Sequence, residues 1–319
     1  MASRRRRGVR GALRAVPRGA VAGALGAVVG GLLVFHRALP GLPGRPAGLL
    51  ETFLPWLGLA VPALLGRALL RRSARAAYAA LLPAAAWLWL FGGFLLPGPD
   101  RAPDLVAVQH NVSDENPDPA GTARALAATG ADLIALEELT PAALPAYAAA
   151  LAPQYPYHAT VGTVGLWSRH PLADARPVDI RPAGLGEDWN RGLRATARTP
   201  RGEAAVYVAH LPSLRLGARG FGSARRDESA VLLGRALAAE PLDRVVLLGD
   251  LNSTVDDRGL APVTDRMTRP ARDFAFSWPA ALPVARIDQV LTRSVTVVRV
   301  RTLPATGSDH LPVAADIRF

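Results

Sequence analysis

The chain has 319 residues, half of them hydrophobic, which is enough for about two domains and too apolar for a disordered protein. It contains no cysteine, which excludes disulfide scaffolds, zinc–thiolate sites, iron–sulfur clusters and thiol catalysis. All 37 basic residues are arginine: residues 1–99 hold 13 of them and one acid, Glu51, whereas residues 100–319 hold 24 and 25 acids. The formal net charge of +11 therefore belongs to the N-terminal third and is no evidence for nucleic-acid binding by the rest.

The N-terminal third is predicted to be a membrane region. Three apolar stretches cover Gly19–Phe35, Leu49–Leu70 and Ala76–Pro97, and a spanning helix needs about 20 apolar residues. The second stretch is the weakest of the three because it carries Glu51 and Arg67, although their positions near its ends allow both side chains to snorkel toward lipid head groups. A cleaved signal peptide followed by buried core helices is the alternative interpretation.

The arginine distribution predicts an orientation. Seven arginines precede the first apolar stretch, and four lie around the segment that joins the second stretch to the third. Only two lie between the first and second stretches, and one, Arg101, directly follows the third. The positive-inside rule then predicts a basic cytoplasmic N-terminus over 1–18, three spans within 19–97 and an extracytoplasmic C-terminal part. A short Pro-rich linker over 98–104 is expected to hold a domain over 105–319 close to the plasma membrane. If only two segments cross, the orientation reverses.

From Leu105 the pattern changes to short β-branched runs that alternate with Ala-rich helical segments. Strands are expected over 105–112, 132–139, 163–168, 193–199, 204–211, 244–250, 287–292, 295–303 and 313–319, and helices over 119–129, 141–151 and 224–239. Mixed elements of this kind predict one α/β or α+β domain.

Polar residues recur where these predicted strands begin or end. They are Asn111, Glu137 and Glu138, His210, Asp250 and Asn252, Asp288, and Asp309 with His310. Each could be an ordinary turn or capping residue, because Asp and Asn favour turns. Their joint occurrence at strand ends instead predicts one polar cleft at an edge of the sheets.

These segments resemble the endonuclease/exonuclease/phosphatase superfamily, which includes DNase I-like nucleases, inositol-polyphosphate phosphatases and bacterial sphingomyelinases. The resemblance covers about 104–319 and rests on segments in the superfamily's order: Asn111, DLIALEE over 132–138, GLWSRHPL over 165–172, His210, GDLNS over 249–253, RID over 286–288 and SDH over 308–310. It implies a four-layer α/β sandwich, in which two packed β-sheets are covered by outer helices. One departure is Glu137, which stands where the superfamily commonly has Gln.

The resemblance also implies a divalent ion, Mg²⁺ or alternatively Mn²⁺. Glu138, Asn111 and Asp309 are the expected metal ligands, since hard oxygen donors suit Mg²⁺. Asp250 is expected to orient and deprotonate water, and Asn252 to hold water or a phosphoryl oxygen.

The remaining catalytic residues implied by the resemblance are two histidines and their partners. His310 is expected to contact the scissile phosphate as a cation, with Asp288 as its carboxylate partner. His210 is expected to be a leaving-group acid. Arg191 is a weaker candidate for a phosphate clamp, and an arginine cluster follows His210 at Arg215, Arg219, Arg225 and Arg226, where it could grip anionic head groups or nucleic acid, or form a solvated helix start.

The function expected is a metal-dependent phosphoester or phosphoanhydride hydrolase, anchored in the bilayer with an extracytoplasmic site. The favoured substrate is a lipid-linked phosphate or pyrophosphate, because a site held above the bilayer meets such substrates at high effective concentration. A weaker resemblance to membrane-bound members of the superfamily associated with glycopeptide resistance points the same way. The alternatives are an anchored Mg²⁺-dependent nuclease and a non-catalytic receptor; fold alone does not choose among substrates.

Overall fold

The structure is a computed structural model that describes residues 20–40, 46–96, 102–217, 220–268 and 273–319. The predicted basic N-terminus over 1–18 lies outside the described residues. Contacts divide the chain into two compact units: residues 1–35 with 55–90, here the helical unit, and residues 36–54 with 91–319, here the sheet unit. The segment 36–54, which the sequence assigns to the membrane region, thus groups with the C-terminal fold.

The helical unit is made of apolar helices. They are α1 (Ala20–Phe35), the short helix η2 (Leu54–Leu59), α3 (Ala60–Arg71), α4 (Ala74–Ala79) and α5 (Leu81–Phe91). Three helical stretches, Ala20–Ala38, Leu54–Arg71 and Ala74–Leu95, are long and apolar enough to cross a membrane. Their number matches the sequence expectation, and crossing itself stays a prediction.

Small residues let these helices approach closely. A Cβ atom on Gly26 would overlap the Ala79 carbonyl oxygen, and one on Gly30 would overlap the Leu82 side chain. Glycines four residues apart form a small-xxx-small stripe, which brings helix backbones together in membrane proteins.

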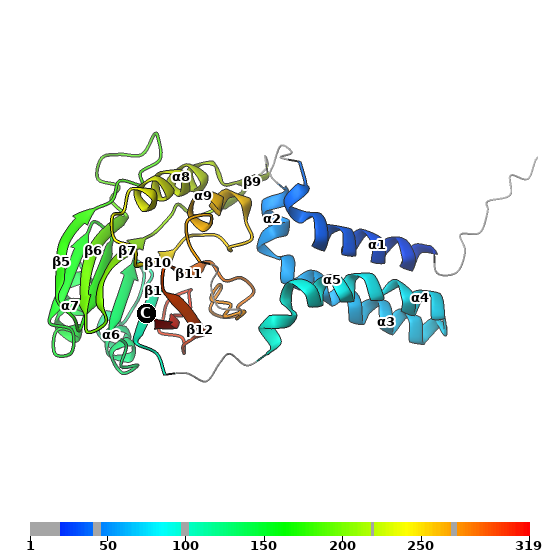
Figure 1. The fold of residues 1–319 in the computed structure, drawn as a ribbon, viewed down its shortest axis with the longest axis horizontal. Helices are drawn as coiled ribbons and strands as arrows, with labels where there is room; N and C mark the ends of the chain where they lie inside the picture. The colour runs from blue at the N-terminus through cyan, green and yellow to red at the C-terminus, as the bar shows by residue number, and fades with distance from the viewer. Residues whose placement is uncertain (1–19, 41–45, 97–101, 218–219, 269–272) are drawn as a thin grey trace, which may run out of the picture. The chain divides into compact units, whose positions relative to one another are not determined.

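The sheet unit contains two large sheets and a small hairpin (Figure 1). The strands are β1 (Leu105–Asn111), β2 (Leu133–Glu137), β3 (Tyr157–Val161), β4 (Val164–Ser168), β5 (Leu172–Pro177), β6 (Gly192–Thr199), β7 (Gly202–Ala209), β8 (Arg215–Gly217), β9 (Gly220–Gly222), β10 (Val245–Asp250), β11 (Asp288–Arg293), β12 (Thr296–Thr302) and β13 (Val313–Arg318). The six-stranded sheet has the order β12-β13-β1-β2-β4-β3, and the five-stranded sheet has the order β11-β10-β7-β6-β5.

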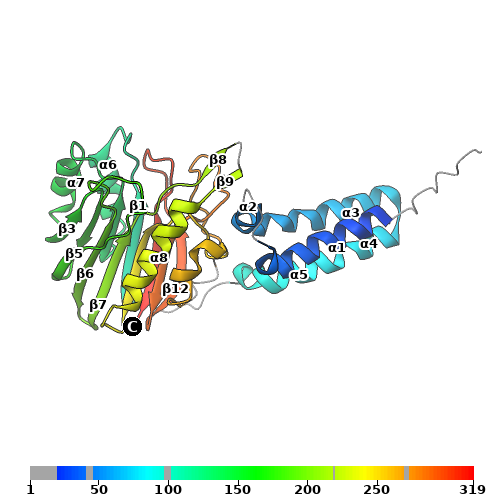
Figure 2. The ribbon, with the colours of Figure 1, turned by 90° about the horizontal axis from the view of Figure 1, so that it is seen from above.

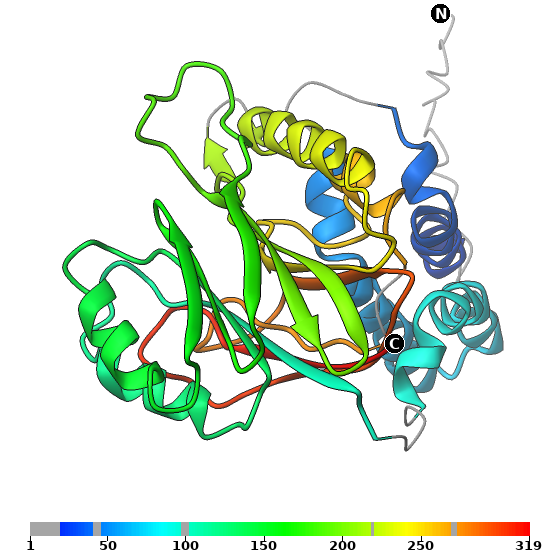
Figure 3. The same cartoon turned by 60° about the vertical axis from the view of Figure 1, so that its left-hand side comes forward.

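Helices cover the outer face of each sheet (Figures 2 and 3). These are α6 (Pro119–Ala127) and α7 (Leu144–Leu151) on the six-stranded sheet, and α8 (Ala224–Ala238) with η4 (Arg258–Leu260) and α9 (Ala261–Thr264) on the five-stranded sheet. One apolar cluster lies between the sheets, and each outer helix layer has a cluster of its own. The predicted four-layer α/β sandwich is therefore confirmed.

The α6 helix illustrates how local sequence sets an element. Asp118 accepts a hydrogen bond from the Gly121 N–H at the helix start, and Pro119 occupies the first turn, both of which favour helix initiation. The buried face carries Ala123, Leu126 and Ala127, which pack on the six-stranded sheet.

The remaining helices of the sheet unit come from the chain before β1. They are η1 (His36–Ala38), α2 (Pro46–Thr52) and η3 (Gly92–Leu95). Glu51 in α2 is fully buried, and its carboxylate accepts hydrogen bonds from the Arg258 N–H at 3.1 Å, from Nε at 3.0 Å and from Nη2 at 2.7 Å. The expectation that Glu51 snorkels to head groups is wrong, because its charge is neutralised inside the sheet unit.

Candidate active site

Strand directions bring the predicted site residues to one end of the sandwich. β1 and β2 run parallel, so Asn111 and Glu137 finish neighbouring strands. β7 and β10 also run parallel, which places His210 and Asp250 at one edge of the second sheet. Asp288 starts β11 directly opposite Asp250 in the antiparallel pair. Strand ends of this kind leave side chains free of the sheet core and able to converge.

His310 and Asp288 form a buried ion pair at this end. The His310 Nδ1–H donates to Asp288 Oδ2 at 2.9 Å, and both side chains are almost fully buried. Burial lowers the pKa of His310, but the charges of Asp288 and Asp250 outweigh burial and raise this pKa to about 10. The imidazole is therefore a cation at neutral pH.

Asp288 also accepts hydrogen bonds from two donors, Gln109 and Ser277, to which the sequence assigned no role. The Gln109 amide donates to Asp288 Oδ1 at 3.0 Å, and the Ser277 hydroxyl donates to Oδ2 at 2.5 Å. Burial raises the pKa of Asp288, yet His310 and these hydrogen bonds dominate and leave it below its usual range. Gln109 stands two residues before Asn111 on β1, a same-face spacing that could have signalled it, whereas no sequence signal marks Ser277.

Glu137, the residue in the usual Gln position, lies in the core beneath this pair. It is fully buried and accepts a hydrogen bond from the Gln109 amide at 2.8 Å. Burial and the neighbouring charge of Asp288 raise the pKa of Glu137 well above its usual range. The environment therefore favours the neutral form of Glu137, the form that resembles the usual Gln most closely.

Asp250 is the most highly connected carboxylate of the site. Its oxygens accept hydrogen bonds from the Asn252 N–H at 2.8 Å, the Asn252 amide at 3.2 Å and the Asn111 amide at 3.1 Å. His310 Nε2 lies 3.9 Å from Oδ2. Burial raises the pKa of Asp250 to about 7 against the lowering effect of His310, a value suited to a group that takes a proton from water.

Asn252 is a positioning residue in this structure. Its amide donates to the Leu211 carbonyl at 2.9 Å as well as to Asp250. Its backbone is left-handed, with φ of 47°, a conformation in which Asn is enriched among non-glycine residues. The expected contact of Asn252 with water or a phosphoryl oxygen stays a prediction.

Glu138 reaches the site from the turn after β2. Its φ of 61° is unusual for Glu, and strain of roughly 1–3 kcal/mol at such positions is common in functional sites. Glu138 Oε1 lies 3.7 Å from His210 Nε2, and Oε2 accepts from the Asp114 N–H. Its side chain is 29% exposed, so solvent reaches this carboxylate.

His210 is buried between Arg191 and the carboxylates. Arg191 Nη1 donates to His210 Nδ1 at 3.2 Å. The same Nη1 lies 3.4 Å from His210 Nε2, and Nε2 lies 3.6 Å from Asp250 Oδ2. Burial and the charge of Arg191 lower the pKa of His210 well below its usual value. The imidazole is thus neutral here, and its expected role as a leaving-group acid stays a prediction.

Arg191 lies beside His210, and its expected role as a phosphate clamp stays a prediction. Its guanidinium stacks over the Trp189 ring at 5.2 Å. Burial lowers the pKa of Arg191, while Glu138, Asp250 and Asp114 oppose that shift. The Arg191 guanidinium therefore lies close to the carboxylates of the site and to His210.

The donor set fits a hard divalent cation. Glu138 and Asp250 supply carboxylate oxygens, and Asn111 Oδ1, which accepts from the Ser113 N–H, keeps a second lone pair. Asp250, Asp288 and His310 also place ligand atoms within 4.8 Å of one another. His310 donates from Nδ1 and is cationic, which disfavours it as a ligand. The ligand roles expected of Glu138 and Asn111 stay predictions.

Two other expectations have different outcomes. Asp309 is exposed, and its expected role as a metal ligand stays a prediction. Arg226 is 1% exposed and bonds Asp257 and the Asn252 carbonyl, which contradicts a surface role in binding anions. The side chains of Arg215 and Arg219 lie outside the described residues.

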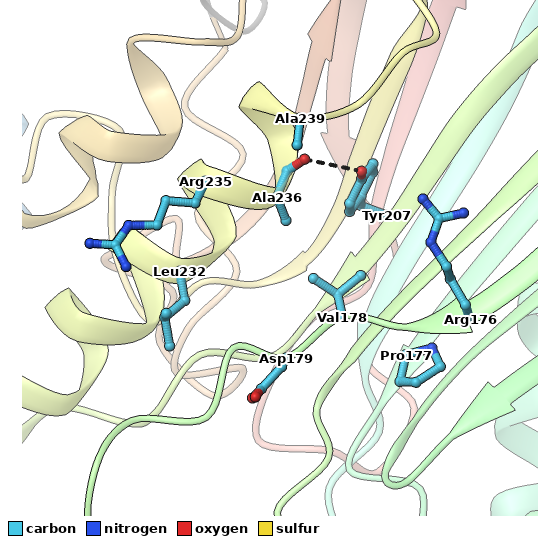
Figure 4. A pocket seen from close by; sticks show the side chains of 9 residues that line it. All are labelled: Arg176, Pro177, Val178, Asp179, Tyr207, Leu232, Arg235, Ala236 and Ala239. Atoms are coloured by element: carbon cyan, nitrogen blue, oxygen red, sulfur yellow. Dashed lines mark hydrogen bonds between the residues drawn. The ribbon is translucent and has the colours of Figure 1, made fainter.

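A surface cavity of about 380 Å³ lies elsewhere, between β5, β7 and α8. Figure 4 shows Arg176 and Tyr207 on the strand side of this cavity and Leu232 and Arg235 on the helix side. None of the predicted site residues lines it. The candidate active site is therefore the polar end of the sandwich.

The family profile for endonucleases, exonucleases and phosphatases matches residues 108–310, more than half of the chain. The chain belongs to the endonuclease/exonuclease/phosphatase family. Members of this family are hydrolases acting on phosphoester bonds. No curated protein matches the chain significantly.

Solved structures share the fold of this family member. A Staphylococcus aureus beta-toxin mutant with bound magnesium ions is 16% identical, with a TM-score of 0.52 and coverage of 67% of this chain and 99% of that one. Sphingomyelinase C from Streptomyces griseocarneus is 22% identical, with a TM-score of 0.50 and coverage of 69% and 99%. TDP2 from D. rerio, complexed with a single-strand DNA product, is 18% identical, with a TM-score of 0.52 and coverage of 67% and 99%.

Proposed function

We propose that the chain is a metal-dependent hydrolase of phosphoester or phosphoanhydride bonds, anchored in the plasma membrane with its active site outside the cytoplasm. Its preferred substrate is a lipid-linked phosphate or pyrophosphate. One observation carries the catalytic part of the proposal: Asp250 Oδ2 lies 3.9 Å from His310 Nε2 and 3.6 Å from His210 Nε2, in a cluster that includes Glu138 and Asn111.

The residues of this cluster supply the steps of hydrolysis. A bound Mg²⁺ would neutralise the phosphoryl oxygens. Asp250, fixed by Asn252 and Asn111, orients a water and accepts its proton. The His310 cation, held by Asp288, stabilises negative charge that develops on the phosphoryl group.

The ion pair between Glu51 and Arg258 supports an extracytoplasmic sheet unit. It joins the connection after the first candidate span to the fold that follows the third, since both belong to the sheet unit. A connection and a domain that pack together lie on one side of a membrane. The second and third candidate spans, Leu54–Arg71 and Ala74–Leu95, must then both cross or both stay out. With the first span crossing and the N-terminus cytoplasmic, the sheet unit lies outside the cytoplasm.

Charge and tether length support a lipid-linked substrate. Residues 100–319 are nearly neutral, whereas a processive nuclease gains affinity from a basic groove. Only nine residues separate the third candidate span, which ends at Leu95, from β1 at Leu105. A short tether raises the effective concentration of substrates carried by the same bilayer.

A parallel substrate panel tests the function. The full chain in lipid nanodiscs with Mg²⁺ is offered undecaprenyl pyrophosphate, a phospholipid, plasmid DNA and RNA, with Asp250→Asn as the matched inactive control. Phosphate release from the lipid pyrophosphate, absent in the control, is expected. DNA or RNA cleavage without release from lipid would instead establish the nuclease alternative, and no turnover of any substrate would favour the receptor alternative.

A reporter fusion tests the orientation independently. Alkaline phosphatase joined after Phe319 folds only outside the cytoplasm, so an active fusion is expected. An inactive fusion, with an active cytoplasmic reporter at the same position, would reverse the proposed topology.

A further inference from the structure

The loop over 274–285 exposes two large apolar side chains next to the candidate active site. Leu282 is 71% exposed and Trp278 is 37% exposed. Soluble surfaces carry scattered apolar residues, but neighbouring ones on one loop mark an interaction site more often. Among the described residues of the sheet unit, the other exposed large apolar side chains are Leu95, Leu96, Tyr157 and Val231.

Hydrogen bonds close this loop on itself and make it a defined structure. The Leu282 N–H donates to the Pro279 carbonyl, and the Val284 and Ala285 N–H groups donate to the Trp278 carbonyl. Ser277 and Trp278 donate in return to the Ala285 carbonyl. The tip at Leu282 is therefore presented by a tight turn.

The same loop is bonded to the catalytic cluster. The Ala280 N–H donates to the Asp309 carbonyl at 2.7 Å, and the Leu311 N–H donates to the Ser277 carbonyl at 2.8 Å. Ser277 also donates from its hydroxyl to Asp288. These bonds join the loop to Asp309 and Leu311, the two sequence neighbours of His310. A molecule bound at the loop tip would therefore lie close to His310.

An aromatic cluster ties the base of the loop to the end of the third candidate span. Phe94 lies 5.1 Å from Phe274 between ring centroids, Phe91 lies 6.2 Å from Phe274, and Phe274 lies 5.4 Å from Phe276. Phe91 and Phe94 are within the span Ala74–Leu95. The next residues, Leu95 and Leu96, are 61% and 69% exposed. Exposed apolar groups thus occur both on the loop and at the point where the chain leaves that span.

We propose that the loop tip, Trp278 and Leu282, lies in the head-group region of the bilayer and contacts the lipid that carries the substrate. A tryptophan and a leucine on a loop whose base, at Phe274, contacts Phe91 and Phe94 suit this region, where amphipathic rings and apolar side chains are favoured. The loop then delivers a membrane-borne phosphate to His310 without extraction of the lipid into water. This inference rests on the proposed membrane anchoring and adds the surface through which the site meets lipid.

Site-directed spin labelling tests the contact directly. The chain has no cysteine, so Leu282→Cys gives a single labelling position in the full chain. The protein is reconstituted in phosphatidylcholine–phosphatidylglycerol vesicles, and collision of the nitroxide with oxygen and with a water-soluble nickel chelate is measured. We expect the label at 282 to favour oxygen over the chelate, as a label in the lipid interface does.

Matched positions make the test decisive. Tyr157→Cys on β3 and Val231→Cys on α8 are exposed apolar controls, at 40% and 37%, and should favour the nickel chelate. Ala281→Cys, also exposed, repeats the loop measurement should Leu282→Cys be poorly folded. A loop label that matches the aqueous controls would overturn the proposal, and so would one shielded from both reagents, which would indicate a protein partner.

Activity gives a second, separable readout. Leu282→Ser should raise the apparent KM for a vesicle-borne phosphate about tenfold and leave hydrolysis of a water-soluble phosphodiester unchanged, whereas Tyr157→Ser should change neither. An unchanged KM on vesicles would overturn the role in presenting substrate. Failure of the wild type to hydrolyse either substrate would count against the proposed function, while the label measurement would still report the lipid contact.

Discussion

Asp288→Asn removes the charge that keeps His310 protonated. Burial lowers the pKa of His310, but Asp288 and Asp250 raise it to about 10, from an ordinary value of 6.5. The raised folded-state pKa means that the pair stabilises the protein fully below about pH 6.5 and that this stability is lost as pH rises through about 10. A difference of roughly 3–4 units corresponds to at most about 5 kcal/mol.

The same substitution should change the pH dependence of catalysis. With a neutral partner, burial dominates and the pKa of His310 falls to about 6.5 or below, so the protonated fraction is at most about a quarter at pH 7 and about 3% at pH 8. We therefore expect kcat/KM to fall at least about fourfold at pH 7 and about 30-fold at pH 8.

The assay is the pH–rate profile of the full chain in detergent with Mg²⁺ and a soluble phosphodiester. In Asp288→Asn the alkaline fall in rate should move down from near pH 10 toward neutrality. Ser277→Ala, which removes one hydrogen bond from Asp288 but leaves its charge, should move it much less. An alkaline limb that stays in place in Asp288→Asn would refute the account of His310 as a catalytic cation.

Three further outcomes are expected. Asp250→Asn should lower kcat by about 10²–10⁴, as loss of a general base does, with circular dichroism unchanged; wild-type turnover would contradict its role. Removal of divalent ions with EDTA should abolish turnover and Mg²⁺ should restore it, which a metal-independent rate would disprove. Arg258→Ala should destabilise the sheet unit by about 3 kcal/mol, because it strands the buried Glu51 carboxylate; thermal unfolding beside exposed Arg198→Ala measures this, and equal midpoints would contradict it.

The fold class followed from the sequence because its central strands are continuous apolar runs. β1, β2, β7 and β10 are buried along most of their length, and such runs bounded by polar residues are the clearest strand signal. β3 was not predicted, since it is a mostly exposed edge strand without an apolar run. Strand β5 and the β8–β9 hairpin were not predicted either, because neither contains a continuous apolar run.

The site was predictable in its residue types and only partly in its connections. The segments that contain Asp250 and His310 are among those that carried the resemblance, and the structure brings these two side chains together. The support from Gln109 to Asp288 spans 179 positions in the chain, so no local pattern could reveal it. Glu51 was misjudged for the same reason: its neighbours are apolar, and only a distant arginine explains its burial.

The bond between Glu51 and Arg258 also bears on how the protein is made. Its two residues lie 207 positions apart, so the ribosome has completed both later apolar helices before the arginine emerges. Until Arg258 is synthesised, Glu51 in α2 has no arginine to pair with. The sheet unit therefore cannot complete its folding before the apolar helices α3, α4 and α5 have been synthesised. A fragment that begins at β1 would lack Glu51 and would leave Arg258 without this ion-pair partner. The full chain is therefore the better form to express.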